Sequence, residues 1–288
     1  MKLTKWFGVA ALATAVVGLA ACGASEKKAD NNTKDKTVTI KVGTMTIDND
    51  EQQRWDLIEK KLEKENVKLE FTQFTEYPQV NKAVADGELD VNAFQHYYYL
   101  NNWNKENNQD LVAIADTYLA PIRLYSGTKD GKNKYTKVDE LPDGAEIAVP
   151  NDATNESRAL NLLQAAGLIK LDKSGNELAT VANVKENPKK LKITELDASQ
   201  TARSLTSVDA AVVNNTFVNE AKLDYKKALF IEPKDKNSKQ WYNIIAAKKD
   251  WEKSDKADAI KKIIAAYHTD EVKELTEKTS DGLLEPVW

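Results

Sequence analysis

The sequence predicts an α/β protein built as two lobes, and three observations support this. Residues 38–71 read as a strand, a helix and a second strand, and a similar succession of segments recurs after residue 130. The chain then ends in helices. Because a strand–helix–strand unit implies a parallel sheet with a right-handed crossover, each of the two blocks predicts a sheet covered by helices.

The first block opens with residues 38–42, where apolar and polar side chains alternate as they do in a strand. In residues 51–66 apolar side chains recur at helical spacing among charged ones. Alternation returns over residues 67–71, and residues 111–114 form another short apolar run. These four segments predict strand, helix, strand and strand.

The second block repeats this organisation. Residues 146–149 predict a short strand that Pro150 ends, and residues 155–168 predict an amphipathic helix with Gly167 as its C-cap. Alternation over residues 191–196 predicts another strand. The remaining predicted elements are strands at 210–213, 228–231 and 243–247, then helices around 260–267 and over 270–278.

The ends of the strands are where a ligand is expected, since open α/β sheets bind ligands at the carboxyl ends of their strands. Four segments follow predicted strands in this way: 94–100, 151–158, 214–217 and 241–243.

The N-terminus has the layout of an export signal. Lys2 and Lys5 precede an apolar run too short for a comfortable membrane span, which needs about 20 residues. The run ends in Leu-Ala-Ala-Cys at Cys22, the only cysteine, and this tetrapeptide resembles the bacterial lipobox. We therefore expect residues 1–21 to be a lipoprotein signal peptide and Cys22 to carry the lipid. A free thiol after an ordinary signal peptide and a transmembrane helix are the alternatives.

Residues 22–37 contain almost no apolar side chains beyond Cys22, so they cannot bury enough surface to offset their ordering entropy. We interpret them as a flexible tether between the lipid and a globular body, and we expect an extracytoplasmic, membrane-attached protein.

Composition narrows the function classes. Loss of residues 1–21 removes two lysines and no acid, so the formal net charge moves from −4 to −6. A mildly acidic exported protein has no electrostatic reason to bind nucleic acid. With Cys22 lipidated and only two histidines, no thiolate or histidine-rich metal site is available. We expect no metal and no cofactor.

Motifs for catalysis are missing from the sequence. It contains no Gly-x-Ser-x-Gly elbow, phosphate-binding loop or His-Glu-x-x-His. A serine nucleophile served by His96 or His268 stays open, because triads assemble in space. We expect a protein that is not an enzyme.

Aromatic side chains concentrate in residues 90–100, with Phe94, His96 and Tyr99 among them. Such a cluster is consistent with core packing at a strand end or with a binding site. Aromatic rings suit a soft thioether, at about 0.3–1.5 kcal/mol for each sulfur–aromatic contact.

Residues 149–158 carry a strand into a helix through turn and capping residues. Arg158 is expected in the first turn of that helix, where a cation opposes the helix dipole. A ligand carboxylate at the helix N-terminus would explain the placement. An ion pair with Glu156 or another surface acid is the alternative.

At this point the chain resembles the substrate-binding lipoproteins of bacterial methionine ABC importers, the MetQ/NlpA type. The resemblance extends from the lipobox to Trp288. It is carried by these segments: 41–43, 76–77, Leu-Asp-Val-Asn-Ala-Phe-Gln-His at 89–96, Ala-Val-Pro-Asn-Asp-Ala-Thr-Asn at 148–155, 187–189, 203–205 and 242–245.

The resemblance implies a two-lobed periplasmic-binding-protein-like fold of type II that closes at a hinge over one small ligand. Lobe 1 would comprise residues 38–121 and 236–288, and lobe 2 residues 122–235. The chain departs from the family pattern at Tyr98, where a proline is common, and Arg123 adds a charge near the presumed hinge.

The resemblance also implies ligand-binding roles. Aromatic residues would enclose the thioether, Arg158 would hold the carboxylate, and three asparagines would bind the head group, although turn or cap duty is the alternative for Asn214 and Asn243. The ligand-binding set is Tyr77, Phe94, His96, Tyr99, Asn155, Arg158, Asn214 and Asn243.

We therefore expect a monomeric binding protein that captures L-methionine or a close analogue and delivers it to an ABC permease with its ATPase. A methionine-containing dipeptide or another amino acid is the alternative ligand. A surface adhesin-type lipoprotein is the alternative of another class.

Overall fold

The computed structural model describes residues 37–288. Cys22, the predicted signal peptide at 1–21 and all of the predicted tether except Thr37 lie outside the described residues. Within the described part, no helix has the length and apolar character needed to cross a membrane.

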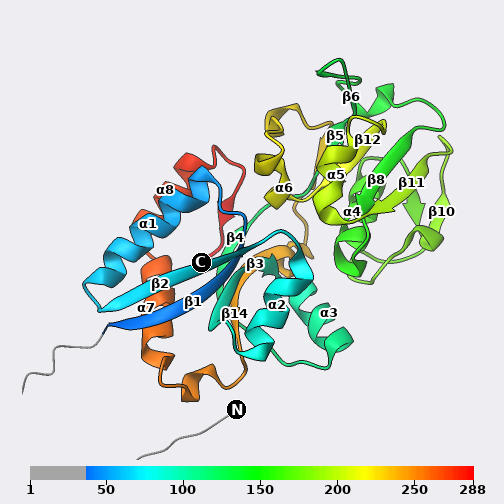
Figure 1. The fold of residues 1–288 in the computed structure, drawn as a ribbon. Helices are drawn as coiled ribbons and strands as arrows, with labels where there is room; N and C mark the ends of the chain where they lie inside the picture. The colour runs from blue at the N-terminus through cyan, green and yellow to red at the C-terminus, as the bar shows by residue number, and fades with distance from the viewer. Residues whose placement is uncertain (1–36) are drawn as a thin grey trace, which may run out of the picture. The chain divides into compact units, whose positions relative to one another are not determined.

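One part of the molecule, which we call the large lobe, is built on a six-stranded sheet (Figure 1). β1 pairs in parallel with β2 and β3, as the strand–helix–strand pattern predicted. The other pairings are antiparallel, because β14 returns from the distant end of the chain and inserts between β3 and β4. The sheet order is β15 (Glu285–Pro286), β4 (Val112–Leu119), β14 (Tyr242–Ala247), β3 (Val91–His96), β1 (Val38–Met45) and β2 (Val67–Phe74).

Helices cover both faces of this sheet (Figure 1). α1 (Asn49–Glu63) and α7 (Ala257–Tyr267) pack on one face, where Trp55, Ile58 and Ile260 join the apolar side chains of β1. α2 (Tyr77–Asp86) and α3 (Tyr97–Asn107) pack on the other face, and α8 (Asp270–Thr279) packs beside α1. The amphipathic spacing of α1 and α7 therefore buries one stripe of each helix in the core.

The second part, the small lobe, is built on a five-stranded sheet. β8 lies between β11 and β12 and is parallel to both, whereas β5 and β13 are antiparallel to their neighbours. The sheet order is β11 (Lys192–Leu196), β8 (Glu146–Pro150), β12 (Ala210–Val213), β5 (Arg123–Ser126) and β13 (Phe230–Ile231). Its helices are α4 (Ala153–Ala165), α5 (Ala198–Ser204) and α6 (Asn215–Glu220), and two small antiparallel pairs are β6 (Thr128–Lys129) with β7 (Lys132–Asn133) and β9 (Lys170–Leu171) with β10 (Val184–Glu186).

The chain passes between the lobes twice, through residues 120–122 and through residues 232–241. The second passage ends in a short 3-10 helix, Ser238–Trp241, immediately before β14. The limits predicted for the two lobes stay a prediction at the level of single residues.

Two predicted elements begin at other residues in the structure. The predicted strand at 228–231 is shortened to β13, because residues 225–227 form a 3-10 turn. The helix predicted from residue 155 begins two residues earlier, because Asp152 caps α4 by accepting from the Asn155 N–H. The prediction that Arg158 lies in the first turn is therefore wrong, and Arg158 lies in the second turn. Gly167 follows the end of α4 with a φ of 76°, as expected for its role.

Candidate ligand-binding site

A pocket lies between the two lobes and holds about 910 Å³, including its opening to solvent. All eight residues of the predicted ligand-binding set line it. The large lobe supplies Tyr77, Phe94, His96, Tyr99 and Asn243, and the small lobe supplies Asn155, Arg158 and Asn214.

One wall of the pocket is aromatic. The ring of Tyr77 lies 5.8 Å from the rings of both Phe94 and Tyr99 and 5.4 Å from that of Phe217, between ring centroids. Burial raises the pKa of the Tyr77 and Tyr99 hydroxyls above the usual tyrosine value. The wall is thus apolar and uncharged, and it offers both faces and edges of rings to a polarizable side chain.

The junction between β3 and α3 places these aromatics. β3 ends at His96, and the His96 ring caps α3 because its Nδ1 accepts from the Tyr99 backbone N–H at 3.0 Å. The cap directs the chain into a helix whose first turn carries Tyr99 into the core. Residues 90–100 therefore agree with both interpretations made from the sequence, because their aromatic side chains pack the core and also line the pocket.

The same hydrogen bond fixes the protonation of His96. Nδ1 is an acceptor, so the ring proton of the neutral imidazole lies on Nε2, which donates to Asn155 Oδ1 at 3.3 Å. Burial and the nearby Arg158 charge lower the pKa of His96 to about 3. His96 is therefore a neutral donor across the physiological range.

A chain of amides continues from this histidine. The Asn155 Nδ2 group donates to both carboxylate oxygens of Asp152, at 3.1 and 3.0 Å, which fixes the orientation of the Asn155 amide. Asn155 Oδ1 then accepts from Asn214 Nδ2 at 2.7 Å. These bonds leave Asn214 Oδ1 buried and without a hydrogen-bond partner among the residues that the structure describes.

An unpartnered buried acceptor is costly, by roughly 1–3 kcal/mol. Because Asn214 lines the pocket, a ligand with an N–H donor at that position would remove the cost. With the amide held in this orientation by Asp152 and Asn155, the Asn214 oxygen can accept a hydrogen bond from a donor such as an ammonium group. Asn243 is paired with His96 in the register of β14 against β3, which brings it to the same end of the pocket.

Arg158 is held on three sides. Its Nε and Nη2 donate to Glu232 Oε1 and Oε2 at 2.7 and 2.5 Å, and Nη2 also donates to the Ala120 carbonyl at 3.0 Å. The guanidinium lies over the Trp241 ring, 4.7 Å from its centroid. Nη1 makes no hydrogen bond to any residue of the described range, so its two N–H groups are the donors left for a ligand.

These contacts correct the interpretation of the α4 N-terminus. The carboxylate that caps this helix belongs to Asp152, so a ligand carboxylate is not needed to explain it. The alternative, an ion pair between Arg158 and an acid, is confirmed, but the acid is Glu232 and not Glu156. The Glu156 carboxylate instead accepts from the Val181 N–H.

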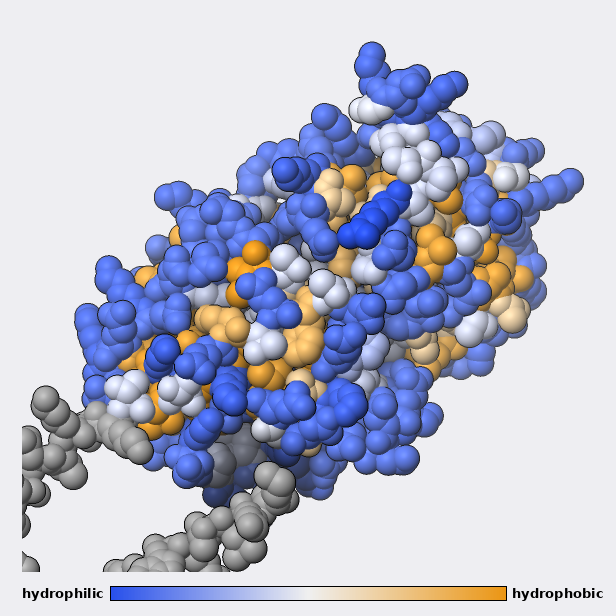
Figure 2. Space-filling view, viewed as in Figure 1, coloured by the Kyte–Doolittle hydropathy of each residue, from blue (hydrophilic) through white to orange (hydrophobic). Residues whose placement is uncertain are grey.

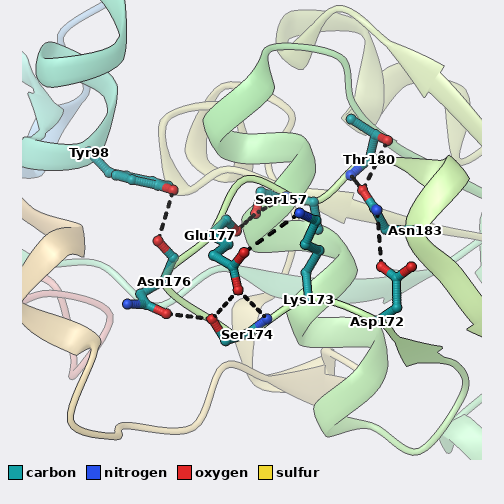
Figure 3. Close-up of polar contacts among 10 residues, drawn as sticks. Tyr98, Ser157, Asp172, Lys173, Ser174, Asn176, Glu177, Thr180 and Asn183 are labelled. Atoms are coloured by element: carbon teal, nitrogen blue, oxygen red, sulfur yellow. Dashed lines mark hydrogen bonds and ion pairs between the residues drawn. The ribbon is translucent and has the colours of Figure 1, made fainter.

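Direct contacts join the lobes around the pocket. Tyr98 donates its hydroxyl proton to the Asn176 carbonyl of the small lobe at 3.3 Å (Figure 3). The loop that carries Asn176 is held by Ser174, which bonds to the Asn176 and Glu177 side chains, and by the Ser157 hydroxyl, which donates to the Glu177 carbonyl. Ser157 precedes Arg158, so this loop is tied to α4 beside the pocket.

Two residues that hold Arg158 lie outside the predicted ligand-binding set, Glu232 and Trp241. Glu232 lies in the second passage between the lobes, in a segment rich in lysine and aspartate, and no spacing pattern marks it. Trp241 packs against the His96 ring at 5.1 Å as well as under Arg158. Trp241 lies in the segment 241–243, which the sequence marked as one of four where a ligand is expected.

The geometry offers binding groups and no arrangement for metal chemistry. Within residues 37–288, no three or more His, Cys, Asp or Glu side chains are grouped so that they could hold a metal ion. The pocket instead combines an aromatic wall, the Asn214 oxygen as an oriented acceptor, and the Arg158 guanidinium, whose Nη1 has no hydrogen-bond partner among the described residues.

Comparison with known proteins places the chain in a family. The sequence profile described as NlpA lipoprotein matches residues 40–288. The chain belongs to the NlpA lipoprotein family. Within it, the chain is 36% identical over 282 residues to the D-methionine-binding lipoprotein MetQ of Escherichia coli K12, covering 96% of each protein.

Solved structures of NlpA-like proteins agree with this. The substrate-binding protein of a methionine transporter from Streptococcus pneumoniae is 72% identical, with a TM-score of 0.85 over 87% of this chain and 96% of that one. A nutrient-binding protein from Burkholderia cenocepacia, solved bound to methionine, is 39% identical, with a TM-score of 0.77 over 86% of this chain and 100% of that one. The predicted two-lobed binding-protein fold is confirmed.

Proposed function

We propose that this protein is the substrate-binding component of a bacterial ABC importer and that its ligand is methionine or a close analogue. The observation that carries the proposal is the arrangement of three unlike features around one pocket. These are the aromatic wall, the free oxygen of Asn214 and the free Nη1 of Arg158. The names of the relatives support the same ligand class.

In this proposal the ligand lies with its ammonium group at Asn214 Oδ1 and its carboxylate at Arg158 Nη1. The thioether side chain then lies against the rings of Tyr77, Phe94 and Tyr99. Burying such a side chain contributes about 1.5–3 kcal/mol, and each hydrogen bond to a charged group about 1.5–3 kcal/mol. Micromolar binding needs about 8 kcal/mol, which these terms reach after ordering costs.

We further infer that the protein acts by binding alone, as a monomer, and closes at the residues that connect its lobes. Cys22 would carry a lipid that holds it at the outer face of the cell membrane. A tether there raises its effective concentration near the permease and its cytoplasmic ATPase.

Mass spectrometry under native conditions tests the ligand. The protein is purified without refolding, so that a bound molecule survives. A mass shift equal to methionine, exchangeable with added methionine, supports the proposal. A dipeptide mass, another amino acid, or a protein that neither carries nor takes up methionine overturns it.

The anchor is tested separately, by comparing the native chain with Cys22→Ser in membrane and soluble fractions. We expect the variant to leave the membrane and the ligand mass to stay the same. Tight membrane association of Cys22→Ser would contradict the lipid anchor without affecting the ligand assignment.

A further inference from the structure

Glu232 lies where the chain crosses between the lobes for the second time, and it binds the first crossing as well. Its carboxylate accepts from the Ile122 backbone N–H at 3.2 Å, and its own N–H donates to the Ile122 carbonyl at 3.0 Å. The side chain is 14% exposed. Glu232 is therefore fixed to the backbone of both connecting segments before any contact with Arg158 is considered.

The Arg158 guanidinium has five N–H groups, and Glu232 takes two of them in a fork. The Ala120 carbonyl, also in the first crossing, takes the second proton of Nη2. The Trp241 ring fixes the plane of the group from one face. The two protons of Nη1 are left, and their direction is set by the Glu232 fork.

We propose that Glu232 is a positioning residue that gives the pocket its selectivity for a ligand carboxylate, because it aims Arg158 Nη1 at that group. This inference rests on the proposed function. Without the fork, only the Ala120 carbonyl and the Trp241 ring, among the described residues, would hold the guanidinium. Binding of a carboxylate ligand would then include a larger cost of ordering this group.

A charge effect alone predicts the opposite outcome. Glu232 is a negative group beside the position assigned to the ligand carboxylate, so neutralising it would favour anionic ligands if position did not matter. Positioning and charge therefore predict opposite changes in the preference for a ligand carboxylate. A ratio of two dissociation constants, one for a ligand without the carboxylate and one for a ligand with it, separates them.

The experiment measures the dissociation constants of methionine and of methioninamide, which lacks the carboxylate, by calorimetry. We expect Glu232→Gln to lower the ratio of the methioninamide constant to the methionine constant by about tenfold or more. Glu186→Gln is the matched control, because Glu186 is an exposed acid of the small lobe paired with Lys170 at 2.7 Å. We expect it to leave the ratio unchanged.

Glu232→Asp is the second variant, since it keeps the charge and shortens the reach by one methylene group. Positioning predicts a lower ratio for this variant too, whereas a charge effect predicts no change. An unchanged or higher ratio in every folded Glu232 variant would overturn the inference. Failure of the native chain to bind methionine would instead contradict the proposed function.

Discussion

At the scale of single residues, the site depends on hydrogen bonds that assign one role to each polar atom. Asp152 orients Asn155, Asn155 orients Asn214, and the last oxygen of the series is left for a ligand. His96 joins the same oxygen of Asn155 as a neutral donor. We therefore attribute the proposed binding selectivity to Asp152 and Asn155 as well as to Asn214, although only Asn214 would contact the ligand in this series.

The neutral state of His96 makes a prediction about pH. Its pKa falls to about 3 in the folded protein, whereas the unfolded value is about 6.5. The unfolded chain thus binds an extra proton below pH 6.5, so this group's contribution to stability is present above that pH and is lost as the pH falls. When the pH falls from 7 to 5, we expect the unfolding free energy of the native chain to fall by about 2 kcal/mol more than that of His96→Gln.

Denaturant unfolding at the two pH values measures this difference. Nitrogen chemical shifts of the imidazole provide a direct check, and they should report a proton on Nε2 that does not titrate between pH 5 and pH 8. A His96 ring that gains a proton near pH 6.5 in the folded protein would contradict the assigned network.

At the scale of elements, most of the predicted site residues lie near the places where a strand gives way to a helix. Phe94 and His96 lie at the end of β3 and Asn214 directly follows β12, as expected for ligands at strand ends. Asn243 instead lies at the start of the antiparallel strand β14, and the other four predicted site residues lie on α2, α3 and α4. Local patterns predicted β1, α1, β2, β8, β11, β12 and α7 because each has a clear apolar period.

Other elements lacked such a period. α2, β3 and α3 were not predicted as elements, because polar and aromatic residues such as Asn92, Gln95 and Tyr97 interrupt their hydrophobic repeats. Asn92 and Gln95 are buried together with Asn81 in a closed set of side-chain amide hydrogen bonds. Glu232 could not be predicted for a different reason, since its partners lie 74 and 110 residues away.

The Tyr98 contact makes a prediction about closure. The hydrogen bond from the Tyr98 hydroxyl to the Asn176 carbonyl is one of those that join the lobes. Tyr98→Phe should therefore favour opening of the pocket and speed ligand release by about two- to tenfold. Stopped-flow tryptophan fluorescence measures the dissociation rate. Tyr97→Phe is the matched control, because the Tyr97 hydroxyl bonds to Asp116 within the large lobe. Equal rates for both variants would rule out a clasp at Tyr98.

The end of β5 makes a prediction about stability. Gly127 donates to the Asp209 carbonyl, and a Cβ added to it would lie 2.1 Å from the Val208 carbonyl oxygen. Gly127→Ala must therefore move the backbone beside β12, at a cost of about 1–3 kcal/mol in unfolding free energy. Thermal or urea unfolding measures the loss, and native stability in the variant would show that this close approach is not required.

At the scale of the whole molecule, the described residues form two α/β lobes whose sheets are mixed rather than purely parallel. The helical period and the alternation predicted the lobes, but the antiparallel pairing of β14 depends on the chain returning after more than 100 residues. No local pattern encodes such a return. The resemblance to a family, and not the pattern, predicted that one lobe is inserted in the other.

The surface of the described residues is mainly polar. Hydrophilic residues cover most of the face seen in Figure 2. Among the described residues, the large hydrophobic side chains that are exposed are Leu178 and Ile231. This composition supports the proposed monomer, in which the pocket between the lobes is the main recognition site.

In the proposed function, Arg158 and the oriented amides bind a methionine-like amino acid in this pocket. Calorimetric titration of ligand-free protein with L-methionine, repeated with Arg158→Ala, measures their contribution. We expect one binding site with micromolar or tighter affinity, and a loss of about 10- to 100-fold or more in affinity in the variant. Equal affinity in both proteins, or no heat of binding in the native chain, would contradict this proposal.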